Sequence, residues 1–437
     1  SPLSAPMMQC ARFLVRVVLL AFTLAAPLRA FRLRRDANLF KLAGKRSNRS
    51  TVRRLSSDIP GFYHTTEEIR QELQELAADC PGMELKSVKS MSDDGQERVV
   101  DVATIRGGGD KPLNRNFFLF GEHARELISA ESGLHFVKSL CGKTSLAERA
   151  REVLRENDFQ IVVNGNPGSR PHVEEGNSCL RVSPSGVDLN RNWAYNWQAE
   201  SVMDPADTNP GPTPFSEPET RTFKELVQDF KPTTFLTVHS GTRGMYMPWA
   251  YDMEHLASRN EPEMMDILKK LDEDHCECPF GAAGREVGYS CPGTCLDWVY
   301  DALKTPYAFA FEIYAGAEHT ASLRQRWREK MASGGAFYQT HKHLGHPFFN
   351  DVFANHPSSF VQVRAGHALE RAWDSQSVAE CFAQFNPGAE DEYKSVLNNW
   401  SGAYLDMASM VVSKLKAGPA GVPVPVDTNV LGQETVD

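Results

Sequence analysis

A histidine and a glutamate three residues apart, His123 and Glu126, occur where a buried strand is expected to give way to a helix. The apolar run 117–120 ends at Gly121, and a helical pattern follows from about Glu126 to Leu140. Side chains three apart on a helical turn face the same way. An imidazole nitrogen and a carboxylate oxygen so placed can bind one divalent cation, most readily zinc. A bare His-x-x-Glu pattern is more often a solvated helix start, so the interpretation needs support from other residues.

A catalytic zinc site needs a third protein ligand and a position open for water. His239 ends the apolar run 234–238 and is the natural third ligand, although an isolated histidine there is more often a hydrogen-bonded core residue. Glu312 follows the apolar run 307–311. A glutamate in such surroundings either pairs with a cation or carries out proton chemistry. Its place at a strand end favours proton chemistry, because water activated at a zinc site still needs a carboxylate to take its proton.

The elements that must position these residues alternate between short apolar strands and helices. The patterns predict helices over 65–78, 126–140, 262–271, 323–341 and 391–414, and strands over 98–105, 116–120, 159–163, 234–238 and 307–311. Glycines 107–109 predict a hairpin turn between two of these strands. Ser216 to Glu219 predicts a capping box that opens a helix ending near Phe230.

The alternation of strands and helices predicts an α/β fold. We expect a single domain with a central mixed, mostly parallel β-sheet flanked by helices. In such sheets the site lies at the carboxyl ends of the strands, where His123, His239 and Glu312 are expected.

Composition restricts the classes of partner. The chain has 437 residues, of which 41% are hydrophobic and 24% charged, as in soluble globular proteins. The net charge of −9 gives no indication of nucleic-acid binding. No stretch after the leader is long and apolar enough to span a bilayer. We expect a monomer with no nucleic-acid partner and no membrane span in the mature chain.

The first 57 residues are expected to target the protein to a compartment and not to form part of the folded domain. A basic start, the apolar run 17–26 and small residues up to Ala30 predict a signal peptide over 1–30. Residues 31–57 are strongly basic and predict a spacer or short propeptide, with 32–35 as a possible processing site. These features predict the secretory pathway, with a secreted or vacuolar/lysosomal destination. The alternative is an organelle reached through a bipartite leader.

The remaining chain is divided into a folded domain and a tail. The domain is expected over 58–415, including a helical C-terminal extension. The Pro-containing, aperiodic residues 416–437 predict a flexible tail.

Four separated motifs resemble those of the zinc metallocarboxypeptidases of the carboxypeptidase A superfamily. They are Gly-x-His-x-Arg-Glu at 121–126, the Asn-Arg motif within 188–193, Tyr289 eight residues before Asp297-Trp298, and Phe-x-Phe-Glu ending at Glu312. The resemblance covers about residues 62–344. The stretch 381–407 is further similar to a plant-type subgroup. The chain differs from the family in two features. Residues 31–57 are too few for the inhibitory prodomain of the digestive subgroup. The C-terminal extension is expected to be helical rather than the small β-sandwich of the regulatory subgroup.

The resemblance implies a reaction and the residues that perform it. One zinc ion would be held by His123, Glu126 and His239, and Glu312 would be the general base that later returns the proton to the leaving amine. Arg181 would stabilise the oxyanion together with zinc, with a solvated loop arginine as the alternative. The substrate would be the C-terminus of a peptide or protein, and the product one free amino acid.

The resemblance also implies substrate-binding residues. Asn190 and Arg191 would bind the substrate's C-terminal carboxylate, for which a guanidinium fork is well suited. Arg125 would bind toward the interior of the substrate, and Tyr289 would close over the bound C-terminus. Leu296 occupies the position of the family's main side-chain selector. Because Leu296 is apolar, we expect a preference for apolar or aromatic C-terminal residues.

The cysteines allow two interpretations. Cys276, Cys278, Cys291 and Cys295, with His275 nearby, could bind a second, structural zinc. Disulfides are favoured because the leader indicates an oxidising compartment. The eight cysteines after the leader allow 105 pairings, so the connectivity does not follow from the sequence. Asn48 and Asn399 begin glycosylation sequons, which matter only in the secretory pathway.

Two other functions are weighed against the carboxypeptidase. A zinc deacylase of the same superfamily would act on a small N-acyl amino acid, but Tyr289 and Trp298 argue against it. An inactive peptide-binding relative would have lost a metal ligand or the general base. The chain keeps all of these residues, namely His123, Glu126, His239 and Glu312.

Overall fold

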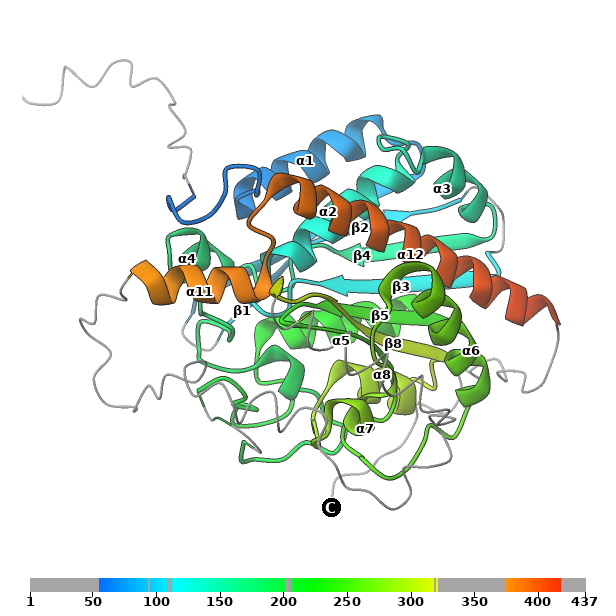
Figure 1. The fold of residues 1–437 in the computed structure, drawn as a ribbon. Helices are drawn as coiled ribbons and strands as arrows, with labels where there is room; N and C mark the ends of the chain where they lie inside the picture. The colour runs from blue at the N-terminus through cyan, green and yellow to red at the C-terminus, as the bar shows by residue number, and fades with distance from the viewer. Residues whose placement is uncertain are drawn as a thin grey trace, which may run out of the picture. The chain divides into compact units, whose positions relative to one another are not determined.

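The computed structural model describes residues 55–92, 95–107, 112–201, 204, 206–317, 320 and 375–417. Eight strands within these residues form one sheet in the order β1-β2-β4-β3-β5-β8-β6-β7 (Figure 1). The strands are β1 (Met83–Met91), β2 (Glu97–Ile105), β3 (Asn114–Phe120), β4 (Asn157–Val162), β5 (Thr234–His239), β6 (Thr242–Met247), β7 (Phe280–Ala282) and β8 (Tyr307–Tyr314). Four of the seven neighbouring pairs are parallel, which confirms the mixed, mostly parallel sheet.

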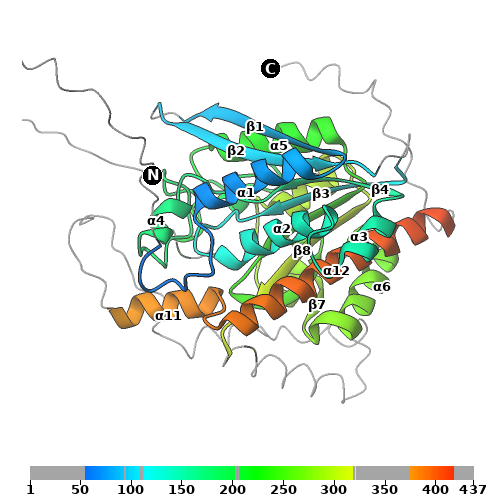
Figure 2. The ribbon, with the colours of Figure 1, turned by 90° about the horizontal axis from the view of Figure 1, so that it is seen from above.

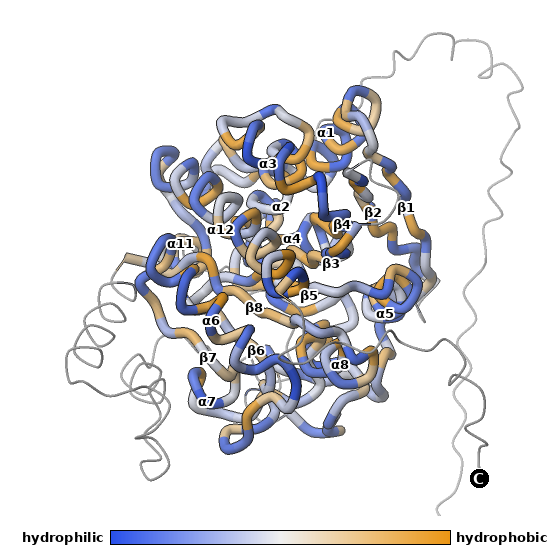
Figure 3. The backbone as a smooth tube through the Cα atoms, turned by 90° about the vertical axis from the view of Figure 1, so that its right-hand side faces the viewer, coloured by the Kyte–Doolittle hydropathy of each residue, from blue (hydrophilic) through white to orange (hydrophobic). Residues whose placement is uncertain are grey.

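Helices cover both faces of this sheet. They are α1 (Thr66–Asp79), α2 (Leu127–Leu140), α3 (Ala147–Val153), α4 (Arg170–Glu174), η1 (Leu189–Arg191), α5 (Pro218–Phe230), α6 (Glu261–Leu271), η2 (Asp272–Cys276), α7 (Ala283–Val287), α8 (Cys295–Ala302), α11 (Ser375–Phe385) and α12 (Glu390–Ala417). Helices α1, α2 and α12 lie on one side of the sheet, and α5 and α8 lie on the other (Figure 3). No helix in the described part of the chain has the length and apolar character needed to cross a bilayer.

Helix α2 is nearly encased, and it begins directly after Glu126. It packs on strands β3 and β4 beside α12, which runs alongside it and itself contacts β3 and β8 (Figure 2). On the sheet, the Phe118 ring lies 5.5 Å from Phe136 of α2 and 6.0 Å from Tyr404 of α12, measured between ring centroids. All three rings are fully buried. Aromatic contacts with both the sheet and α12 therefore hold α2, the helix that begins directly after Glu126.

Several expected elements are found with small shifts. Helix α1 begins after Thr65, whose hydroxyl accepts from the Glu68 amide in a capping box. The strands expected at 98–105, 116–120, 159–163 and 234–238 correspond to β2, β3, β4 and β5. Strand β8 extends to Tyr314, so Glu312 lies inside the strand rather than after its end, because pairing with β6 continues past it. The predicted helix 323–341, the leader 1–54 and the tail 418–437 lie outside the described residues.

Two local predictions are wrong. Strands β2 and β3 do not form a hairpin, because β4 lies between them and pairs with both. Helix α5 is not opened by a capping box at Ser216. It begins at Pro218 with Glu217 at the N-cap position and no side-chain cap. The Ser216 hydroxyl instead donates to Glu217 Oε1 and accepts from Asn192 Nδ2.

Six of the cysteines form disulfides in the described residues. The pairs are Cys80–Cys141, Cys179–Cys381 and Cys276–Cys278. Cys291 and Cys295 are buried and are not disulfide-bonded. The preference for disulfides over a second zinc site is therefore confirmed for three pairs. In the Asn399 sequon, both side-chain amide atoms bond to His275, so that asparagine is engaged within the fold.

A buried ionic cluster anchors α2 to the start of the domain and makes stability depend on pH. His64 Nδ1 lies 2.7 Å from Glu131 Oε2 of α2, and His64 Nε2 lies 3.1 Å from Glu72 Oε1 of α1. Burial alone would lower the pKa of His64, but hydrogen bonds to Glu131 and Glu72 outweigh it and raise the pKa to about 9. The charged imidazole therefore links the two helices at neutral pH.

We expect His64→Gln to lower the free energy of unfolding most at or below pH 6.5. A raised histidine pKa contributes stability that is complete below the unfolded value and is lost as pH rises through about 9. The upper limit of this contribution is about 3 kcal/mol, since a pKa change of one corresponds to about 1.4 kcal/mol. Denaturant unfolding at pH 6.5 and 9.5 measures the difference between the two proteins. A difference that stays constant or grows over this interval would contradict the assignment.

Candidate active site

Three neighbouring parallel strands bring the predicted residues to one edge of the sheet. Strand β3 leads into His123 through Gly121, whose φ of 69° lies in the left-handed region that favours glycine. Strand β5 ends at His239, and its register places His239 directly opposite Glu312 of β8. The carboxyl ends of parallel strands meet at the same sheet edge. The structure therefore brings His123, His239 and Glu312 together from segments far apart in the sequence.

Three potential ligand atoms converge in a buried cluster. His123 Nδ1 lies 2.7 Å from Glu126 Oε1 and 3.1 Å from His239 Nδ1, and His239 Nδ1 lies 3.2 Å from Glu126 Oε2. All three side chains are at least 95% buried. Among the described residues, this is the one group of histidine, cysteine, aspartate or glutamate side chains that could hold a metal ion. Two imidazoles and a carboxylate are the ligand set of many catalytic zinc sites.

A buried carboxylate fixes the proton of the first histidine. Asp188 Oδ1 lies 3.1 Å from His123 Nε2, and Asp188 Oδ2 accepts from Arg181 Nη2 at 2.9 Å. Burial would raise the pKa of Asp188, but Arg181 and His123 lower it well below its usual range. An ionised carboxylate only accepts hydrogen bonds, so His123 carries its proton on Nε2. Its Nδ1 lone pair then faces the cluster.

A hydroxyl relay does the same for the second histidine. Thr237 Oγ1 donates to Glu122 Oε2 at 2.7 Å and lies 2.8 Å from His239 Nε2. Because the single hydroxyl proton goes to Glu122, Thr237 must accept from His239 Nε2–H. The buried Cys295 thiol lies 3.5 Å from the same Glu122 oxygen. The relay leaves His239 Nδ1 as an acceptor.

The site therefore requires a cation at its centre. Two Nδ1 lone pairs and a carboxylate repel one another unless a positive charge lies among them. A proton meets this need in part: although burial alone would lower the pKa of His239, hydrogen bonds to Glu122 and Glu126 raise it to about 10. Zinc would meet it with all three ligands at once. The residues present thus fit one zinc ion.

Glu312 has the surroundings of a proton acceptor. Burial and the nearby Glu126 carboxylate raise the pKa of Glu312 to about 8. Its Oε2 atom is buried without a hydrogen-bond partner among the described residues. An acid–base group works best when its pKa is near the operating pH. The position across the sheet from His239 places this group beside the metal cluster.

Arg181 and Asn190 also reach the cluster. Arg181 Nη1 lies 3.5 Å from Glu126 Oε1, so its charge is at the site despite its place in an irregular loop. Asn190 lies in η1, and its Nδ2 atom is 3.3 Å from His239 Nε2. The Asn190 Oδ1 atom accepts from the backbone amide of Cys295 at 2.9 Å, which links η1 to the start of α8.

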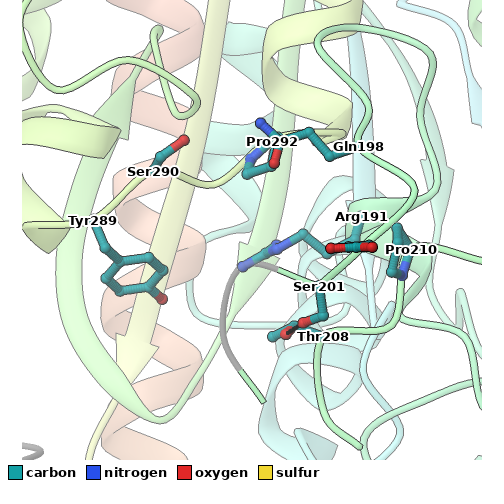
Figure 4. A pocket seen from close by; sticks show the side chains of 9 residues that line it. Arg191, Gln198, Ser201, Thr208, Pro210, Tyr289, Ser290 and Pro292 are labelled. Carbon is teal, nitrogen blue, oxygen red and sulfur yellow. Dashed lines mark hydrogen bonds between the residues drawn. The ribbon is translucent and has the colours of Figure 1, made fainter. Parts of the chain in front are cut away.

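Arg191 and Tyr289 line one pocket. The pocket also includes Thr208, Pro210 and Ser290, and the Arg191 side chain extends from its loop toward the side on which Tyr289 lies (Figure 4). Both are predicted to hold the substrate's C-terminus, and their shared pocket agrees with that use.

Arg125 and Leu296 lie outside this pocket. Arg125 bonds to Asp207 Oδ2 at 3.0 Å and to the Cys179 carbonyl, and its guanidinium stacks 4.3 Å above the Phe385 ring. Leu296 is 2% exposed and belongs to the hydrophobic core. Its role as a side-chain selector stays a prediction.

The sequence did not point to three residues of this site. Asp188, Thr237 and Glu122 act through the histidines rather than on a substrate. Asp188 precedes Asn190 in the recognised motif, and Thr237 and Glu122 each lie within two residues of a metal ligand. Metal-binding imidazoles almost always donate their second N–H to a hydrogen-bond acceptor. The need for such an acceptor beside each histidine was the signal that could have found these residues.

Comparison with known proteins identifies the family. Residues 69–333 match the family model described as zinc carboxypeptidase. This chain belongs to the zinc carboxypeptidase family. Carboxypeptidase A2 of Mus musculus is 28% identical over 269 residues, which cover 58% of this chain and 63% of the relative. Carboxypeptidase B of Astacus astacus is 26% identical over 274 residues, covering 57% of this chain and 86% of the relative. The match thus spans less than two thirds of the mouse enzyme.

Two solved structures share the fold. The crystal structure of thrombin activatable fibrinolysis inhibitor aligns with a TM-score of 0.57 and 18% identity over 80% of this chain and 75% of that chain. Carboxypeptidase A from Helicoverpa armigera aligns with a TM-score of 0.50 and 22% identity over 67% of this chain and 78% of that chain. At these identities the likeness supports the fold alone.

We expect the Thr237 hydroxyl to be required for tight zinc binding. Thr237→Val removes the hydroxyl and leaves His239 Nε2 with the more distant Glu122 Oε2, at 3.4 Å, as an acceptor, whereas Thr237→Ser keeps the hydroxyl. Loss of a partner behind a metal-bound histidine typically weakens affinity about 10- to 100-fold. Competition for zinc against a chromogenic chelator should show this loss for the valine variant alone. Equal affinities for valine and wild type would show that the relay has no influence on the metal.

Proposed function

We propose that this zinc carboxypeptidase family member hydrolyses the last peptide bond of peptides or proteins and releases one C-terminal amino acid. The observation that carries the proposal is the placement of Glu312 directly across the sheet from His239, beside the His123–Glu126–His239 cluster. A metal cluster alone would also suit a structural or binding role. A buried carboxylate of raised pKa at its edge adds the proton acceptor that hydrolysis requires.

Each group of residues in the site would have a separate role in the reaction. Zinc would be held by His123, Glu126 and His239, and when bound it supplies a Lewis acid for the scissile carbonyl and makes water more acidic. Glu312 accepts the proton of the attacking water and delivers it to the leaving amine. Arg181, held charged by Asp188, offers N–H donors to the negative charge that develops on the carbonyl oxygen.

Recognition of the C-terminus would use the neighbouring pocket. Arg191 supplies a guanidinium fork for the terminal carboxylate, and Tyr289 supplies a hydroxyl on the same pocket. Asn190, which reaches His239, would place the carboxylate between this pocket and the metal cluster. A requirement for a free carboxylate in this pocket would restrict the enzyme to the last residue of its substrate.

We expect release of free phenylalanine from an N-blocked dipeptide to require both metal and Glu312. A chelator should abolish release, and added zinc should restore it. Glu312→Gln keeps the shape of the side chain but removes the proton acceptor, so kcat/KM should fall at least about 100-fold. Glu219→Gln, a buried glutamate on α5 away from the cluster, serves as the matched control. Full activity of Glu312→Gln with zinc bound would exclude Glu312 as the general base.

The proposed preference is for apolar or aromatic C-terminal residues, based on Leu296. Peptides that differ only in a final Phe, Lys or Glu should rank with Phe highest in kcat/KM. Leu296→Asp should shift the ranking toward Lys, because a carboxylate in the selector position attracts a cationic side chain. A wild-type preference for Lys would exclude Leu296 as the selector.

The proposal extends to the compartment and oligomeric state of the enzyme. The three disulfides support a route through the secretory pathway, in which they persist. A secreted or vacuolar/lysosomal destination, a monomeric state and the plant-type subgroup are part of the same proposal. The assignment to the plant-type subgroup depends on the sequence pattern of residues 381–407, which run from α11 into α12.

A further inference from the structure

We propose that Asn386, in the C-terminal segment, is a positioning residue for the turn that supplies Glu126 to the metal site. The inference rests on the proposed zinc-dependent function. Asn386 lies between α11 and α12, beyond the region 69–333 that matches the family model. Residues 381–387, which include Asn386, are called the C-terminal clip below.

Asn386 bonds to the backbone on both sides of Glu126. Its Nδ2 donates to the Arg125 carbonyl oxygen at 2.9 Å, and its Oδ1 accepts from the Ile128 amide at 2.9 Å. The side chain is 1% exposed, so solvent cannot replace these bonds. One amide group therefore bridges the residues that flank the metal ligand.

The start of α2 needs such a partner. Glu126 occupies the N-cap position, where side chains commonly accept from the first helix amides, but it makes no side-chain cap. Its Oε1 faces His123, and its Oε2 faces His239 and the Ser240 amide. The ligand is thus unavailable to its own helix, and Asn386 supplies the acceptor that the Ile128 amide requires.

The C-terminal clip is itself held in place from several directions. The Cys179–Cys381 disulfide joins it to the loop that contains Arg181, and Tyr63 Oη donates to the Pro387 carbonyl oxygen at 2.9 Å. The Phe385 ring stacks on Arg125 and packs so closely on Gly241 that a Cβ there would lie 2.5 Å from the ring. The amide of Asn386 therefore has a fixed position from which to hold the turn.

We expect Asn386→Ala to weaken zinc binding on the order of 10-fold, as for other partners behind metal ligands. The matched control is Asn399→Ala on α12. Asn399 also uses both amide atoms, but it bonds to His275, which is not part of the cluster. Zinc affinity is measured by chelator competition. Hydrogen exchange of the amides at 126–128 is measured in the same proteins and should become faster in Asn386→Ala alone.

The outcomes separate this inference from the proposed function. Wild-type protein that binds no zinc would reject the proposed function and this inference together, whereas wild type that binds zinc but releases no amino acid would reject the proposed function alone. If wild type binds zinc, then unchanged affinity and exchange in Asn386→Ala, or an equal loss in Asn399→Ala, would overturn the positioning role alone. Should Asn386→Ala fail to fold, Asn386→Asp carries the test, because it keeps the acceptor for Ile128 and loses the donor to Arg125. A loss of affinity and faster exchange are expected there too.

Discussion

The mutual repulsion of three buried acceptors is the constraint around which this site is built. The Nδ1 atoms of His123 and His239 and the carboxylate of Glu126 converge in a buried site, shielded from bulk solvent. Such an arrangement is stable only around a positive charge, and each acceptor must be held against the tendency to move away. The buried carboxylates Asp188 and Glu122 are part of the same arrangement, because they determine which imidazole nitrogen is left without a proton.

The sheet makes this convergence geometrically simple. Strands β3, β5 and β8 are adjacent and parallel, so one edge of the sheet receives His123, His239 and Glu312 without any long loop having to place them. The groups proposed to meet the substrate come from outside the sheet: Arg181 and Tyr289 lie in irregular segments and Arg191 in the short helix η1. The candidate metal ligands and proton acceptor thus lie at or near strand ends, and the proposed recognition groups lie mainly in connecting segments, which is the usual division in folds of this class.

Sequence patterns predicted the fold class and selected four residues that the structure brings close together, because both depend on local signals. Apolar runs that end at a histidine or a glutamate are visible in a single chain, and parallel strands align their ends. Strand order is not local, which is why the insertion of β4 between β2 and β3 was missed and a hairpin was expected. Strand β6 was also missed, because Arg243 and Gly244 interrupt its apolar pattern. The Asp188–His123 and Thr237–Glu122 hydrogen bonds join segments 65 and 115 residues apart, so the pairing of these residues does not follow from local sequence patterns.

The bond between Asn386 and Ile128 has a consequence for biosynthesis. Its two partners are 258 residues apart along the chain, and Asn386 belongs to one of the last segments that the structure describes. A ribosome makes the N-terminal part first, so the strands that carry His123, His239 and Glu312 emerge well before the residue that holds the turn of Glu126. The turn that contains Glu126 therefore lacks both Asn386 bonds until residue 386 has been synthesised.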